Sequence, residues 1–251
     1  MTGLPLTRLV RVELRKMFDT RSGFWLLTGI GVLAVVATVA AILFAPEESV
    51  TYATFTAAIG LPMSVILPVI AILAVTSEWS QRSGLTTFTL VPHRGRVIGA
   101  KALATLVVGA GSTLIALAVG AVGNLAGSAL AGVDLVWDVS LRDAPQLMLG
   151  NLMGMAIGFT LGVVLRSSAA ALVGYFVVSF VLSGVFELLA LVQESFRDAQ
   201  PWLDWNTAQI ALFDGATTTA EAWARFASTT GLWIVLPLLA GLLTLRRAEV
   251  K

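Results

Sequence analysis

The residue types that usually carry catalysis are almost absent from this sequence. It has no cysteine and a single histidine, His93, so it offers neither a thiolate nucleophile nor a His/Cys metal site. The pattern Gly-x-x-x-x-Gly-Lys-Ser/Thr, which cradles nucleotide phosphates, does not occur, and neither does His-Glu-x-x-His or Gly-x-Ser-x-Gly. We therefore expect a chain that is not an enzyme and that has no cofactor of its own.

The residues that could still carry a function lie in segment 77–101, where they could bind a partner protein. This segment carries four basic residues, and its apolar residues include a spaced set of three, Leu85, Phe88 and Leu90. Three apolar residues are too few for a membrane span, but they are enough to dock on a partner surface. Pro92 would end any helix that precedes Arg94.

The rest of the chain must then supply the elements that hold this segment. Hydrophobic residues make up 57% of the sequence and charged residues 12%, against roughly 45–50% and roughly 25% in soluble domains. The apolar residues come in continuous blocks, and a helix needs about 20 of them to cross a bilayer core. We predict an all-α polytopic membrane protein with six spans, at Phe24–Phe44, Thr56–Thr76, Ala102–Leu125, Gln146–Leu165, Ala169–Leu191 and Thr229–Leu245.

The first of these spans is expected to stay in the protein. A basic leader precedes it, and Pro46, Glu47 and Glu48 follow it in place of a small-residue cleavage site. We therefore predict a separate leader element over residues 1–23 and a single six-helix transmembrane domain over residues 24–251.

The basic residues are distributed unevenly between the two sides that six spans define. Of the 16 lysines and arginines, 13 fall in the leader, in segment 77–101, at Arg166 or after the last span. The other side holds Arg142, Arg197 and Arg225 and most of the acidic residues. By the positive-inside rule we predict a multi-pass protein of the cell (plasma) membrane with both termini in the cytoplasm.

The leader has the pattern of a helix that lies on a membrane surface. At 100° per residue, apolar residues gather on one side of a helix over Pro5–Phe18 and arginines gather on the other. We assign the interfacial role to Arg8, Arg11, Leu14, Arg15 and Lys16. The alternative is a basic leader that is merely solvated.

Two predicted spans contain glycines or prolines that bear on how the helices pack and move. The fourth has Gly150, Gly154, Gly158 and Gly162 on one stripe, which favours close packing of another helix. The second has Pro62 and Pro68, which loosen a helix and occur both in moving pathways and in static spans.

Two further features concern the side that we predict to be external. Glu187 lies near the end of the fifth span, close enough to reach water. Segment 193–228 contains Trp202, Trp205 and Trp223, and indole rings favour short helices at or dipping into the outer interface.

Two cytoplasmic stretches resemble a known family. The residues concerned are Glu13, Leu14, Arg15, Lys16, Thr20 and Arg21 before the first span, and Ser77-Glu78-Trp79, Thr86-Thr87, Leu90, Pro92, Arg94, Gly95, Arg96 and Ala100-Lys101 after the second. With the six-span topology, they resemble the type-2 ATP-binding-cassette exporter permeases of bacteria, most closely the small six-span members of actinobacteria.

The resemblance implies that two permeases, either two copies or a copy and a sister chain, associate with each other. Each would sit on a separate ATPase subunit that holds ATP and Mg. The leader would be the connecting helix, and a coupling helix would dock on the ATPase through Glu78, Arg82, Leu85, Thr86, Thr87, Phe88, Leu90, Pro92, Arg94 and Arg96. Spans two and five would line a cargo path that includes Pro62, Ser64, Pro68, Phe176, Phe180, Ser183 and Glu187.

The function expected on this basis is export of an amphipathic or hydrophobic cargo by alternating access, with lipid as a neighbour and no nucleic acid. One alternative is a stand-alone secondary transporter, although such carriers usually hold several charged groups at the midplane. The other is a membrane scaffold or assembly protein that transports nothing, which the glycine stripe and the basic face suit equally well.

Overall fold

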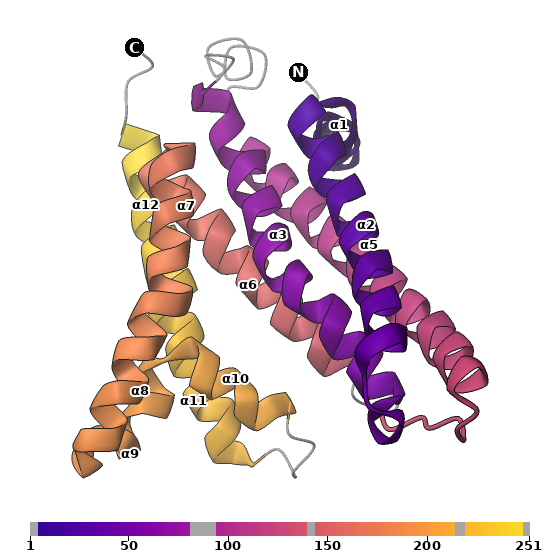
Figure 1. The fold of residues 1–251 in the computed structure, drawn as a ribbon. Helices are drawn as coiled ribbons and strands as arrows, with labels where there is room; N and C mark the ends of the chain where they lie inside the picture. Colours follow the sequence, from indigo (N-terminus) through magenta and orange to yellow (C-terminus); the bar gives the residue numbers. More distant parts are fainter. Residues whose placement is uncertain (1–4, 81–93, 140–143, 214–218, 248–251) are drawn as a thin grey trace. The chain divides into compact units, whose positions relative to one another are not determined.

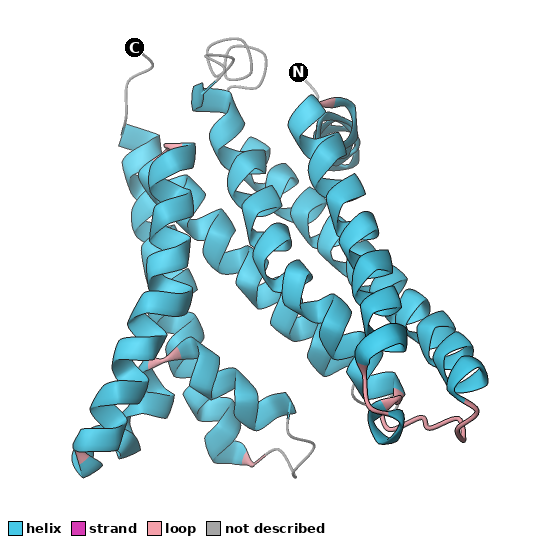
Figure 2. Ribbon diagram, in the orientation of Figure 1, coloured by secondary structure: helices cyan, strands magenta, loops and turns pink. Residues whose placement is uncertain are grey.

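The computed structural model describes residues 5–80, 94–139, 144–213 and 219–247. Within these ranges the regular structure is helical and no strand occurs (Figure 2). Up to residue 165, the described residues form four long helices, preceded by a shorter one, and Figure 1 shows how the chain runs through them. They are α1 (Leu6–Asp19), α2 (Arg21–Phe44), α3 (Tyr52–Ser80), α5 (Arg94–Ala131) and α6 (Ala144–Leu165), with a short turn η1 (Glu47–Ser49) after α2.

From residue 168 on, the described residues form two long helices with two shorter ones between them. The first long helix runs through α7 (Ser168–Phe176), a π-helical stretch η2 (Val177–Leu182) and α8 (Ser183–Val192). The connection consists of α9 (Glu194–Leu203) and α10 (Trp205–Phe213), and α11 (Ala220–Thr230) begins the second long helix. The last helix continues from α11 through a second π-helical stretch η3 (Gly231–Val235) into α12 (Leu236–Arg247).

Six helices among the described residues are long and apolar enough to cross a bilayer. They begin at Arg21, Tyr52, Gly95, Pro145, Ser168 and Ala220 and have between 21 and 37 residues. The prediction of six spans is confirmed in this sense, and the six helices indicate a multi-pass membrane protein. Several helices extend beyond the predicted spans. α5 begins at Arg94 instead of Ala102, so segment 77–101 is helical at both of its described ends.

The chain divides into two compact units. Unit 1 comprises residues 1–70 and 103–154, and unit 2 comprises residues 71–102 and 155–251. In unit 1, Phe55 of α3 is fully buried against α5. Gly123 and Gly127 permit this contact, because a Cβ at either position would lie within 2.9 Å of the Phe55 ring. α5 and α3 therefore approach each other closely at these glycines.

The start of α3 is held by the segment that follows α5. Asp138 Oδ1 accepts a hydrogen bond of 2.7 Å from the Ala53 backbone N–H, and the Val136 carbonyl accepts one of 3.2 Å from the Tyr52 N–H. The Tyr52 hydroxyl donates to the Leu117 carbonyl of α5 at 3.0 Å. The first two bonds satisfy backbone N–H groups that the first turn of a helix leaves free, and the third joins α3 to α5.

The core of unit 2 is built where α3, α6 and α7 meet. Ile72, Ile157, Ala171 and Tyr175 are buried together, and Trp205 of α10 packs against them. At Gly162, an added Cβ would lie 3.2 Å from Val75 Cβ, so this member of the predicted glycine stripe does support close packing of α6 on α3. In the same unit, the hydroxyls of Thr76 and Ser168 are hydrogen-bonded at 2.7 Å, which joins α3 to α7.

Candidate functional site

The predicted docking segment is only partly within the described residues. Arg82, Leu85, Thr86, Thr87, Phe88, Leu90 and Pro92 lie outside them. Glu78 lies in the last turn of α3, and Arg94 and Arg96 lie in the first turn of α5. The structure therefore shows what holds the two ends of the segment.

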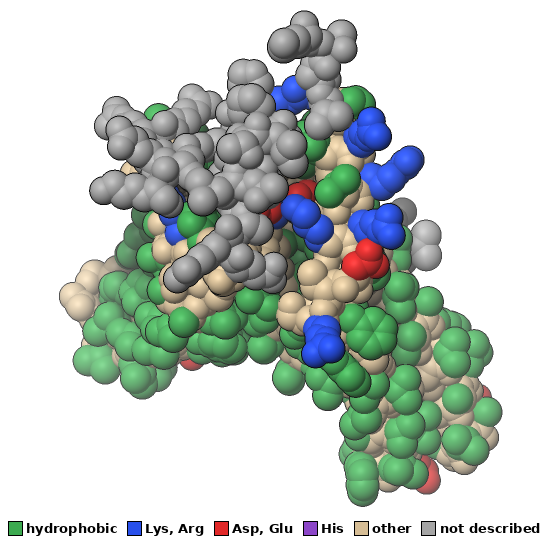
Figure 3. All heavy atoms as spheres, turned by 90° about the horizontal axis from the view of Figure 1, so that it is seen from above, with side chains coloured by type: hydrophobic (Ala, Val, Ile, Leu, Met, Phe, Trp, Pro, Cys, Tyr) green, Lys and Arg blue, Asp and Glu red, His purple; other side chains and the backbone are tan. Residues whose placement is uncertain are grey.

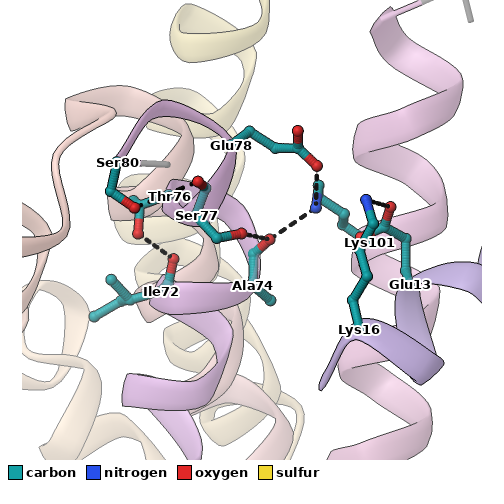
Figure 4. A network of polar contacts seen from close by, with 9 residues as sticks. All are labelled: Glu13, Lys16, Ile72, Ala74, Thr76, Ser77, Glu78, Ser80 and Lys101. Atoms are coloured by element: carbon teal, nitrogen blue, oxygen red, sulfur yellow. Dashed lines mark hydrogen bonds and ion pairs between the residues drawn. The ribbon is translucent and has the colours of Figure 1, made fainter. Parts of the chain in front are cut away.

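Those two ends are joined by a buried ion pair. Lys101 of α5 places its Nζ 3.1 Å from Glu78 Oε1 of α3, and the side chains are 1% and 4% exposed, respectively. The same Nζ donates a hydrogen bond of 2.9 Å to the Ala74 carbonyl, one turn earlier on α3 (Figure 4). The ammonium group thus bridges a carboxylate and a backbone carbonyl of the other helix.

The surroundings explain why a charged pair is stable here. Val97, Ile98 and Ala100, the neighbours of Lys101 on α5, are also buried, so little water reaches this part of the helix, and the Lys101 ammonium group finds its partners on α3. A buried lysine or glutamate is costly on its own, and pairing with added hydrogen bonds offsets that cost. The pair fixes the separation of α3 and α5 beside residues 81–93. The sequence analysis assigned Glu78 to coupling and included Lys101 among the residues that carry the resemblance, but it did not predict that the two side chains pair.

The leader forms α1, with its arginines exposed. Arg8, Arg11 and Arg15 are exposed, and Leu14 is half-buried. Arg15 Nε lies 2.9 Å from Asp19 Oδ2, and Lys16 Nζ lies 2.9 Å from Glu13 Oε1. Figure 3 shows basic side chains along this end of unit 1, with hydrophobic side chains beside them. A position of α1 on a membrane surface remains a prediction.

The predicted path residues divide between the two units. In unit 1, Ser64 is exposed, Pro62 is half-buried and Pro68 is buried within α3. The Ser64 hydroxyl donates to the Leu61 carbonyl of its own helix at 2.8 Å. A hydroxyl bonded within its own helix has its donor satisfied there, so its presence does not by itself indicate a path.

In unit 2, the path residues separate into an exposed set and one buried member. Phe176 and Phe180 are exposed and stack with ring centroids 5.8 Å apart, and Glu187 is exposed farther along the same helix. Ser183 is instead buried, and its hydroxyl donates to Asp204 Oδ1 at 2.8 Å. Ser183 therefore serves the packing of α8 against the junction of α9 and α10.

The sequence reading did not foresee the polar cluster to which Ser183 belongs. Asp204 separates α9 from α10, and it caps α10 by accepting from the Asn206 N–H at 3.1 Å and from the Thr207 hydroxyl at 2.7 Å. The sequence Asp204-Trp205-Asn206-Thr207 is a recognisable helix start. Nothing in the sequence, however, indicates that this start meets Ser183, which is 21 residues away.

Of the four glycines in the predicted stripe, Gly154, Gly158 and Gly162 are buried and Gly150 is half-buried.

A comparison of the sequence with models of known protein families finds no match, and a comparison with curated proteins finds none either. The function of the chain must therefore be argued from its own residues and their geometry.

Proposed function

We propose that this chain is the membrane-spanning permease subunit of an ATP-driven exporter of the ATP-binding-cassette type, in the cell membrane. ATP and Mg bind to a separate ATPase subunit. Two permeases pair to form the path for an amphipathic or hydrophobic cargo. Both chain termini lie in the cytoplasm, as the distribution of basic residues indicates.

The observation that carries this proposal is the Lys101–Glu78 pair. A segment that transmits force from an ATPase must be attached to spans that do not move independently beside it. Lys101 ties α5 to α3 through a carboxylate at 3.1 Å and a carbonyl at 2.9 Å, next to the segment that resembles the family's coupling helix. A push on residues 81–93 is then delivered to both spans together.

Exposed arginines on α1 fit the same arrangement. Arg8, Arg11 and Arg15 are exposed on a helix that directly precedes the first long apolar helix. A basic helix in this position lies on the cytoplasmic leaflet, with its charges toward anionic headgroups. The exposed, stacked rings of Phe176 and Phe180 are the part of the predicted path that suits an apolar cargo.

The proposal is tested by isolating the chain from its native membrane. A tag at the C-terminus, extraction in mild detergent and mass spectrometry of the purified complex should reveal a stoichiometric ATPase that carries the phosphate-binding loop. Absence of such a subunit under several gentle conditions would contradict the proposal. The stand-alone carrier and the scaffold would then be distinguished by testing whether the reconstituted chain transports a cargo when an ion gradient is applied.

A pair of leucine variants makes this test specific to the docking segment. Leu85→Asp places a charge among the predicted apolar contacts, so the amount of ATPase recovered and the transport rate should both fall. Leu135→Asp changes an exposed leucine in the segment after α5, on the predicted external side, and should leave recovery unchanged. Equal recovery with both variants would show that residues 81–93 do not dock the ATPase.

A further inference from the structure

The long helix of residues 168–192 contains a stretch of unusual geometry. Residues Val177–Leu182 are π-helical, between the regular turns of α7 and α8. A π-helical turn holds one residue more than an α-helical turn and is rare, and it persists only where surroundings stabilise it. At its exit, the Ser183 N–H bonds the Phe180 carbonyl, which is a tighter bond than the α-helical pattern.

The surroundings that stabilise η2 come from the start of α10. Asn206 Nδ2 donates to the Ser179 carbonyl inside η2 at 2.8 Å, and also to the Ser183 hydroxyl at 2.9 Å. One side-chain amide thus contacts both the π-helical backbone and the first residue of α8. In a membrane span, a backbone carbonyl can find a partner of this kind only in the protein itself, because lipid supplies none.

The position of Asn206 is in turn fixed by Asp204. This residue is only 3% exposed and accepts hydrogen bonds from Ser183, Thr207 and the Asn206 backbone. Gln200 Nε2 donates to the Thr207 hydroxyl at 3.2 Å, which extends the network back into α9. The network is therefore continuous from α9 through α10 to α8.

The last long helix also contacts the junction, but here its own side chains donate to junction carbonyls. Its π-helical stretch η3 contains Trp233, whose Nε1 donates to the Leu203 carbonyl at 2.8 Å. Ser228, just before η3, donates to the Trp202 carbonyl at 3.1 Å. Both π-helical stretches are thus hydrogen-bonded to residues 202–206.

The junction lies well inside the length of the helices that it contacts. Ser183 is nine residues before the end of α8 at Val192, which corresponds to about 14 Å along a helix. α9 runs back alongside α8, as Figure 1 shows, and ends at this depth. The tip at Asp204 and Asn206 is therefore inserted between two long apolar helices.

We infer that Asn206 is a latch for a conformational switch in this helix. With Asn206 bonded to Ser179, η2 keeps its extra residue. When the tip withdraws, the Ser179 carbonyl loses its side-chain partner, and η2 converts to an α-helix so that a backbone N–H replaces it. The conversion turns α8 relative to α7 by about one residue, or roughly 100°.

The switch is tested with two spin labels on the same helix. The chain has no native cysteine, so Val173→Cys and Leu188→Cys give two labelled positions, both more than 60% exposed, on either side of η2. The native chain should give one distance distribution. Asn206→Ala should add a second population, shifted by several ångströms, because α8 has turned. Gln209→Ala is the matched control, since the bond that the described residues show for Gln209 Nε2 stays within α10, to the Trp205 carbonyl.

An Asn206→Ala variant with the single native distribution would overturn the latch. If that variant fails to fold, amide exchange of the native chain decides the matter. Release of one latch predicts that residues 179–185 and 204–207 open together and share one opening rate, whereas unrelated rates would overturn it. Both measurements use the chain without an ATPase, so their failure leaves the proposed transport function untouched, and the reverse also holds.

Discussion

Lys101 and Glu78 belong to different helices, α5 and α3, and their charged atoms lie 3.1 Å apart where almost no solvent reaches. Their positions bracket residues 81–93, the segment that resembles a coupling helix. An ion pair of this kind is sensitive to the loss of either partner, which makes its role measurable.

Neutralising either member of the pair alone should strongly destabilise the protein. Neutralising both together should cost less than the two single losses added. Lys101→Met or Glu78→Gln alone removes the counter-charge that the other buried group has across this pair, and breaking such a pair typically costs about 3–5 kcal/mol. The double variant should lose clearly less than the sum of the two, as thermal melting of the purified protein in one detergent would show.

The control for this cycle is the exposed pair on α1. Arg15 and Asp19 lie 2.9 Å apart with side chains 82% and 62% exposed, so Arg15→Gln should change the melting temperature little. Additive losses for Lys101 and Glu78 would show that the two charges do not stabilise each other.

Close packing of α5 on its neighbours predicts that an alanine will lower stability at one glycine of this helix and not at another. A Cβ at Gly123 would lie 2.7 Å from Thr38 Cγ2 and 2.9 Å from Phe55 Cδ1, so Gly123→Ala should cost about 1–3 kcal/mol by overpacking. Gly111→Ala, on the same helix but with no atom within 4 Å, should be neutral or gain up to about 1 kcal/mol.

A compensating change distinguishes overpacking from a general effect on the helix. Thr38→Ser removes the methyl group nearest to Gly123, so it should recover part of the stability that Gly123→Ala loses. Equal melting temperatures for Gly123→Ala and Gly111→Ala would mean that α5 does not pack this closely in the folded protein.

The number and approximate position of the six spans could be predicted because long apolar runs leave a helix as the only stable structure in lipid. The ends could not. The predicted third span began after Lys101, since a lysine reads as a loop, whereas Glu78 neutralises it inside α5. The last long helix begins at Ala220 and not at Thr229, because Glu221 and Arg225 pair along an exposed helical turn that has too little apolar character to be counted.

The two candidate sites differ in how far they could be predicted from the sequence. Glu78 was found through local sequence likeness, which needs no tertiary information. The latch was missed, because it depends on Asn206 meeting a carbonyl 27 residues earlier, at Ser179. Ser183 illustrates the same limit. Its place on the fifth span suggested a path, and only the position of Asp204 shows that its hydroxyl is used inside unit 2.

The cap on α3 provides a third prediction. Asp138 Oδ1 accepts from the Ala53 N–H at 2.7 Å, so Asp138→Ala should lower stability by about 0.5–2 kcal/mol, whereas Asp138→Asn keeps an acceptor and should lose less. Asp134→Ala, which changes an exposed residue in the same segment, is the control for removing a negative charge. Equal losses from Asp134→Ala and Asp138→Ala in a thermal melt would rule out the cap.

The backbone at Arg166 provides a fourth prediction, in which two effects oppose each other. Arg166 has φ +52°, a left-handed conformation that costs a residue with a side chain roughly 1–2 kcal/mol, and it follows the end of α6 where glycine is the usual residue. Its Nη2 also donates to the Thr244 hydroxyl of α12 at 2.7 Å, which is worth about 0.5–1.5 kcal/mol.

Three variants separate the strain from the bond. Arg166→Gly relieves the strain but loses the bond, so its melting temperature should stay near that of the native chain. Arg166→Ala loses the bond and keeps the strain, and Thr244→Val loses only the bond. The expected order of stability is therefore Arg166→Gly above both others. If Arg166→Gly melted no higher than Arg166→Ala, the left-handed conformation would not be strained in the folded protein, and the bond to Thr244 would be the whole contribution of this residue.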